Sequence, residues 1–136
     1  MNTVKRAKYR AVYRIEAYED TLRYAYTQKV VHGYLAKKGE RYVIIDTEGN
    51  HEWLINPKDE KTIGQFTGVC DKHGTEIYEG DIVQQTIGEG EEKKLVHKGV
   101  VEYYEGGYFV VGNAEESEGV WLYDTFLDLE VIGNNF

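Results

Sequence analysis

The sequence predicts a mainly β protein, a small and partly open barrel packed with an N-terminal β-meander, with few or no short helices. Short segments rich in β-branched and aromatic residues follow one another, with turn signals between them. The 136 residues include 12 Tyr but only 1 Pro, a composition that suits strands. We expect a single domain over 1–136, with a β-meander over 1–60 and the barrel part over 61–136.

The first 30 residues are compatible with a strand or with a helix. Apolar residues recur at spacings of three or four, as on one helix face, and no Gly or Pro precedes Gly33. An alternation typical of a strand runs through the same residues. Tyrosine favours a strand and alanine a helix, so the periodicity leaves both structures open for residues 4–29. The alternating apolar positions are Tyr9, Ala11, Tyr13, Ile15 and Ala17.

The middle of the chain predicts a series of short strands. Residues 30–36 and 41–46 are apolar and partly β-branched, with a Lys-Gly turn between them. A turn containing glycine follows, and residues 51–55 can return as a hairpin partner. Pro57 ends that strand because it has no N–H to donate, and residues 63–67 form another short strand.

Three further strands are predicted near the end of the chain. Residues 99–104 and 108–112 flank a Glu-Gly-Gly turn and predict a hairpin. Residues 127–131 alternate apolar and acidic side chains, as in a strand with one solvated face. The segments 88–94 and 113–119 have little apolar surface to bury, and we expect both to be mobile, solvated loops.

Charge is unevenly distributed along the chain. The net charge of −8 argues against nucleic-acid binding through the overall field. Residues 1–60 carry a net charge of +2 and residues 61–136 carry −10, which allows head-to-tail attraction between copies. A basic N-terminal strand could still contact nucleic acid locally, and the acidic half could mimic DNA. The basic residues are Lys5, Arg6, Lys8, Arg10 and Arg14.

Residues 63–83 carry the most information. They predict a strand, a turn, a short strand, a tight turn and a strand. Asp71 stands at the first turn position, where its carboxylate can accept a backbone N–H, and Gly74 stands where a positive φ is expected. Gly80 and Asp81 precede an apolar pair, an entry common at the first strand of SH3-like barrels.

This segment resembles the shared core of the YopX-like proteins of phages and prophages of Gram-positive bacteria. The resemblance extends to residues 8–12, 31–35 and 129–134, and it leaves out the loops near 86–98 and 113–118. His73 departs from the usual Asn of the turn. The motif residues expected to shape turns and strand entry are Gln65, Phe66, Thr67, Gly68, Asp71, Gly74, Ile77, Tyr78, Glu79, Gly80, Asp81, Ile82 and Val83.

The resemblance implies a fold and a setting rather than a reaction. It implies a β-rich protein with an SH3-like part around residues 76–133, and it favours a strand for residues 4–29. It also implies self-association and a location in the cytoplasm of the bacterial host. The sequence agrees with that location, because no apolar run approaches the roughly 18 residues of a spanning helix and no signal peptide is recognisable.

No residue pattern points to catalysis. Cys70 and His73 have the spacing of metal ligands but lack a second ligand pair. They also lack the orienting group and oxyanion hole of a nucleophilic site. Gly88 and Gly90 are not followed by the Lys-Ser/Thr and helix of a phosphate-binding loop. We therefore expect no enzyme activity, no metal and no cofactor.

Aromatic residues are the best candidates for an interaction surface, because Tyr and Trp are enriched at interfaces. Some of them are equally expected in the core of a small barrel. We predict an accessory protein that acts through protein–protein contacts, as a homo-oligomer and with an unknown phage or host protein. The alternative is a nucleic-acid-linked module. The candidate surface residues are Tyr104, Tyr108, Trp121 and Tyr123.

Overall fold

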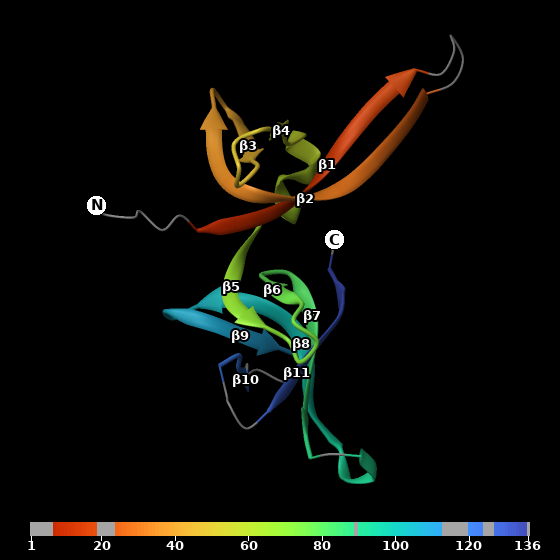
Figure 1. The fold of residues 1–136 in the computed structure, drawn as a ribbon, viewed down its shortest axis with the longest axis vertical. Coiled ribbons are helices and arrows are strands. Elements are labelled where there is room, and N and C mark those ends of the chain that lie inside the picture. Colours follow the sequence, from red (N-terminus) through yellow and green to blue (C-terminus); the bar gives the residue numbers. More distant parts are fainter. Residues whose placement is uncertain (1–6, 19–23, 89, 113–119, 124–126, 136) are drawn as a thin grey trace. The chain divides into compact units, whose positions relative to one another are not determined.

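The computed structural model describes the chain except for residues 1–6, 19–23, 89, 113–119, 124–126 and 136. The described residues form eleven β-strands and two 3₁₀ helices, so the mainly β prediction is confirmed (Figure 1). Two compact units divide the chain, unit 1 over Met1–Gln65 and unit 2 over Phe66–Phe136. The described residues include no helix long and apolar enough to cross a membrane.

Unit 1 is an antiparallel meander in the sheet order β4-β3-β2-β1-β5. Its first strand pairs along its whole length with the second, from Lys8 opposite Tyr34 to Tyr18 opposite Tyr24. Strand structure therefore replaces the helix alternative for the described N-terminal residues. The strands are β1 (Lys8–Tyr18), β2 (Tyr24–Lys38), β3 (Arg41–Ile45), β4 (Glu52–Leu54) and β5 (Gly64–Cys70), of which β5 pairs with β1 through Gly64 and Gln65.

Alternation explains why the N-terminal segment forms strands. Ala11 of β1 and Val31 of β2 face each other on one side of the ribbon and are buried with Ile44 and Ile55. The next residues along each strand point to the opposite side, because successive side chains in a strand alternate. The spacing of three to four residues along the same segment has no structural role here.

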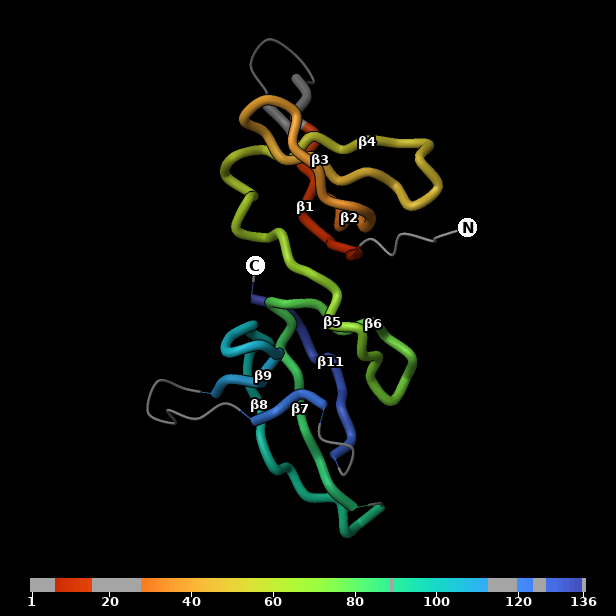
Figure 2. The backbone as a smooth tube through the Cα atoms, turned by 90° about the vertical axis from the view of Figure 1, so that its left-hand side faces the viewer, coloured from red at the N-terminus to blue at the C-terminus, as the bar shows by residue number. Residues whose placement is uncertain are grey.

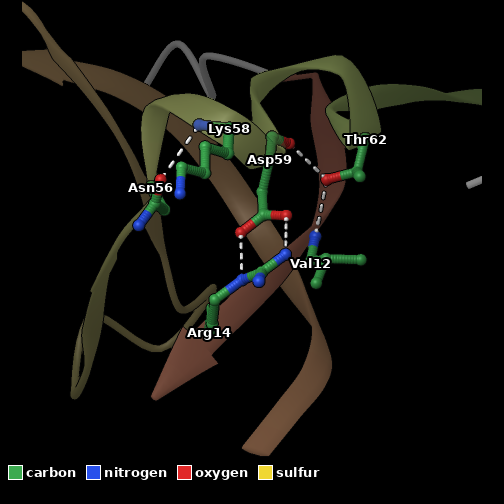
Figure 3. Close-up of polar contacts among 6 residues, drawn as sticks. All are labelled: Val12, Arg14, Asn56, Lys58, Asp59 and Thr62. Atoms are coloured by element: carbon green, nitrogen blue, oxygen red, sulfur yellow. Dashed lines mark hydrogen bonds and ion pairs between the residues drawn. The ribbon is translucent and has the colours of Figure 1, made fainter. Parts of the chain in front are cut away.

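A 3₁₀ helix, η1 (Pro57–Thr62), follows β4 and lies against the edge of β1 (Figure 3). Asn56 caps it by accepting a hydrogen bond from the Lys58 N–H at 2.9 Å. The Thr62 hydroxyl accepts the Val12 N–H at 2.9 Å and donates to the Asp59 carbonyl at 2.6 Å. This hydroxyl therefore satisfies a backbone donor at a sheet edge that would otherwise be unpaired.

A buried ion pair joins η1 to the same strand. The Asp59 carboxylate accepts two hydrogen bonds from the Arg14 guanidinium, at 3.1 and 2.9 Å (Figure 3). The Asp59 side chain is only 6% exposed and that of Arg14 is 24% exposed. The planar guanidinium matches a carboxylate in this two-bonded geometry, so the pair fixes η1 in register on β1.

Unit 2 consists of an open five-stranded sheet and a short hairpin, which residues 66–70 of β5 form with β6. The antiparallel sheet has the order β10-β9-β8-β7-β11, with β10 and β11 at its edges. Figure 2 shows β11 running beside β7. The elements after β5 are β6 (Glu76–Tyr78), β7 (Asp81–Ile87), η2 (Gly90–Glu92), β8 (Lys94–Tyr104), β9 (Gly107–Val111), β10 (Val120–Trp121) and β11 (Asp128–Asn134).

The core of unit 2 lies between the hairpin and one face of the sheet, here called the inner face. Ile77 of β6 is fully buried there against residues of β7, β8, β9 and β11. The opposite, outer face is not covered by any strand of the part of unit 2 that is described. The other buried core residues are Val83, Val101, Tyr108, Val110, Leu122 and Leu129.

The first of the two predicted loops contains regular structure. The segment 88–94 contains η2, and β8 begins at Lys94 rather than at the predicted residue 99. Pairing with β7 extends the strand there, although Leu95 and Val96 are both exposed and give no burial pattern. The predicted loop at 113–119 lies outside the described residues.

We predict that Asp59→Ala lowers the free energy of unfolding by about 2–4 kcal/mol, because it leaves the Arg14 guanidinium without its buried partner. Urea denaturation of a Trp121→Phe background, followed by Trp53 fluorescence, measures the effect in unit 1. Lys38→Gln is the control, because the Lys38–Glu52 pair is exposed and should contribute little. Equal stabilities of the two variants would contradict the prediction.

Candidate interaction surfaces

The motif around Asp71 connects the turn after β5 to strand β11 of unit 2. The Asp71 carboxylate accepts the N–H groups of His73 and Thr75 through Oδ1, both at 2.9 Å. Its Oδ2 accepts the N–H of Val131 on β11 at 3.0 Å. Gly74 has a φ of +83°, as the sequence predicts for this turn. One side chain thus closes the turn after β5 and attaches it to the edge of the sheet.

The environment of Asp71 favours its charged form. The residue is only 8% exposed, and this burial acts to raise the pKa. The hydrogen bonds from Val131, Thr75 and His73 outweigh it, and the pKa of Asp71 lies below its usual value. The carboxylate is therefore held as an acceptor and is not poised to exchange protons near neutral pH.

Other motif residues also have structural partners. Asp81, 1% exposed, accepts the Tyr78 N–H at 2.8 Å across a turn in which Gly80 has a φ of +93°. The Thr67 hydroxyl donates to the Ile77 carbonyl at 2.8 Å. The remaining predicted motif residues lie on the same strands and turns: Gln65, Phe66 and Gly68 on β5, Glu79 in the turn, and Ile82 and Val83 on β7.

A row of aromatic side chains begins on the outer face of unit 2 and ends at the β10 edge of the sheet. The β8–β9 turn has two residues with positive φ, Glu105 and Gly106, so Tyr104 pairs with Gly107. Phe109, two residues after Gly107, therefore shares the face of Tyr104. The ring centroids of Tyr104 and Phe109 are 4.3 Å apart in a stacked arrangement.

The row continues across β10. Trp121 pairs with Phe109, and their ring centroids are 4.9 Å apart, edge to face. The Tyr123 ring lies 4.7 Å from that of Trp121, and its hydroxyl donates to the Thr67 carbonyl at 3.1 Å. Tyr123 also packs against the inner-face core, so the row ends at the β10 edge of the sheet. Burial raises the pKa of Tyr123, with a smaller effect from nearby Tyr103. We call Tyr104, Phe109, Trp121 and Tyr123 the aromatic row.

Gly107 makes room for the row. A Cβ built on this residue would overlap the six-membered ring of Trp121, so the indole lies directly over the glycine backbone. Trp121 is nevertheless 42% exposed, while Tyr104 and Phe109 are half-buried. The indole is therefore held in place by its neighbours and still presents a large apolar area to solvent.

The structure divides the four predicted surface aromatics. Tyr104, Trp121 and Tyr123 belong to the aromatic row. Tyr108 lies on the inner face and is 7% exposed, within the core. Phe109, which joins the row together, was absent from the sequence prediction. Two sequence signals identify the face of Phe109: a two-residue turn after Tyr104, and the alternation of side chains along β9.

The three described basic residues of the N-terminal segment do not form one open cluster. Arg14 is paired with Asp59, and Arg10 is 7% exposed. Lys8 is half-buried at the start of β1. Lys5 and Arg6 lie outside the described residues. Direct binding of nucleic acid by this segment stays a prediction, and Arg10 and Arg14 are built into unit 1.

Cys70 and His73 lie near the same turn, and no third metal-ligating side chain is grouped with them among the described residues. Cys70 is exposed, and His73 Nε2 lies 3.9 Å from Oε1 of Glu130, whose other oxygen, Oε2, pairs with Lys72 at 3.1 Å. Across the described part of the chain, no three His, Cys, Asp or Glu side chains are grouped so that they could hold a metal ion.

Comparison with protein families gives a match to the YopX protein family over residues 8–136. The chain belongs to the YopX family. The resemblance expected from residues 63–83 is thereby confirmed. No curated protein and no solved structure gives a significant match.

Charge in this YopX-family chain follows its two units. Unit 1 contains 12 Lys/Arg and 9 Asp/Glu, a net charge of +3, and unit 2 contains 4 and 15, a net charge of −11. Residues 99–136 contain eight Asp/Glu and no Lys or Arg at all. The aromatic row therefore lies in a part of the sequence that supplies only negative side-chain charge.

We predict that Asp71→Asn lowers the free energy of unfolding at pH 7 by about 1–3 kcal/mol, because an amide cannot replace both oxygens as acceptors. Because the folded pKa of Asp71 is lowered, its contribution is complete above the ordinary pKa of 3.8 and disappears as the pH falls through the folded value. The difference from the natural chain should therefore shrink under acid conditions.

Urea denaturation at a series of pH values measures this difference. Glu91→Gln, at an exposed position of η2, is the matched charge-removing control and should leave stability almost unchanged. A difference between Asp71→Asn and the natural chain that stays constant down to strongly acid pH would exclude the carboxylate as its cause.

Proposed function

We propose that this YopX-family chain is a non-enzymatic phage or prophage accessory protein that acts in the bacterial cytoplasm through protein–protein contacts, including contacts between its own copies. The observation that carries the proposal is the aromatic row, in which Tyr104, Phe109 and Trp121 lie on the outer face of unit 2. Trp and Tyr bury a large area on association with little loss of side-chain freedom, and they dominate binding energies at interfaces.

The surroundings of the row support this role. Val100 and Val111 are paired on the same face and are half-buried, and Ile82 pairs with Val100 from the next strand. Together with the row they make an apolar face larger than scattered exposed residues would give. Contiguous apolar patches with polar surroundings mark interaction sites on soluble proteins.

The non-catalytic part of the proposal is supported by how the motif is used. Asp71 and Asp81 are the buried carboxylates of the motif, and both accept backbone N–H groups at turns. A catalytic carboxylate needs access to a substrate and a pKa suited to proton transfer. These two side chains instead shape the β5–β7 segment, which positions the sheet carrying the row.

We predict that Trp121→Ser reduces self-association by about tenfold or more in dissociation constant, as expected for loss of an interface tryptophan. Size-exclusion chromatography with light scattering, over a dilution series from tens of micromolar, measures it. A strictly monomeric natural chain at the highest concentration would contradict the proposed self-association.

Two further variants distinguish specific association through the row from nonspecific association through exposed aromatic residues. Gly107→Ala keeps every aromatic residue but displaces the Trp121 ring, and it should weaken association as well. Tyr103→Ser is the control, because Tyr103 is 57% exposed but lies outside the row, in edge contact with Tyr108. Equal losses for Trp121→Ser and Tyr103→Ser would assign no special role to the row.

A further inference from the structure

We infer that the aromatic row is the docking site for the basic N-terminal segment that precedes β1, residues 1–7, of a second copy of this chain. The inference rests on the proposed self-association and adds which parts of the two copies meet. It joins two features that the fold leaves on different units: an apolar face bordered by acidic residues, and a run of cations at the start of the chain.

The acceptor side combines aromatic rings with carboxylates. Glu102 pairs with Phe109, so its side chain starts on the outer face beside the row, and it is exposed. Glu105 is exposed in the turn directly after Tyr104. The nearest Lys in the sequence is Lys98, four residues before Glu102 on β8. A cation arriving at the row therefore meets both π-faces and negative charge.

The donor side is complementary in charge. The first 14 residues contain five Lys/Arg and no Asp/Glu. Arg14 is paired with Asp59 and Arg10 is buried, so both are committed to unit 1. Lys5 and Arg6 precede the first residue of β1 and belong to a stretch with no opposite charge of its own. Lys and Arg placed over Trp or Tyr faces gain cation–π attraction, which is largest for Trp.

The two patches are different, so the contact is heterologous. Each copy offers one donor segment and one acceptor row, and contacts of this type lead to closed rings or to open chains of copies. A copy without a working donor segment still has its row, and a copy without a working row still has its donor segment. These two copies should therefore bind each other through that one remaining contact. That property gives a direct test.

The experiment mixes two full-length variants, Lys5→Glu/Arg6→Glu, which keeps the row, and Trp121→Ser, which keeps the segment. Each variant alone should have a dissociation constant about tenfold or more higher, because the cation–π and ionic contacts are lost, and should be monomeric by light scattering at a concentration where the natural chain still associates. An equimolar mixture should form a one-to-one complex that dissociates as salt is raised. Circular dichroism checks that both variants are folded.

Matched controls separate position from net charge. Lys58→Glu/Lys61→Glu changes the charge of unit 1 by the same amount at two exposed positions, and it should assemble like the natural chain. Glu102→Lys/Glu105→Lys removes the acidic border while keeping the rings, and it should pair with Lys5→Glu/Arg6→Glu, because the charges of donor and acceptor are then exchanged together.

The outcomes distinguish this inference from the proposed function. If Lys5→Glu/Arg6→Glu assembles normally while Trp121→Ser does not, the row binds another part of a second copy, and the inference is overturned while the proposed function stands. A mixture of the two variants that stays monomeric also overturns the inference. That result is expected if the N-terminal segment docks on the row of its own chain. A natural chain that never associates removes the self-association on which both depend.

Discussion

Unit 2 depends on one carboxylate that satisfies three backbone donors. Buried N–H groups must be paired, and an edge strand exposes a row of them. Asp71 accepts N–H groups from its own turn and from Val131 on β11, and the Lys72 N–H donates to the Leu129 carbonyl at the same edge. The turn is thereby attached to the sheet, which brings Ile77 into the core and leaves the outer face open.

Unit 1 solves the same problem with different groups. The Thr62 hydroxyl receives a backbone N–H from β1, and Asp59 holds Arg14 two residues further along that strand. In both units a short irregular segment covers a sheet edge through an oxygen acceptor. The net charge differs, because unit 1 contains 12 basic and 9 acidic residues, whereas unit 2 contains 4 and 15.

Much of this fold is predictable from local signals. Turns were recognisable because glycine and aspartate stand where positive φ and backbone acceptors are needed, as at Gly74 and Asp71. The extension of β8 was not, because Leu95 and Val96 are exposed and carry no alternation of burial. The face of Tyr108 and Phe109 depended on the turn having two residues rather than three, since one residue reverses every side chain beyond it.

Because the indole of Trp121 lies over Gly107, the substitutions that each of these positions tolerates depend on the residue at the other. A methyl group at position 107 displaces the ring, so a lineage that keeps the tryptophan must keep the glycine. Once position 121 has become small, position 107 is released and can accumulate side chains that favour strands. Mutational order therefore matters, and a lineage that filled position 107 could regain the tryptophan only after restoring glycine.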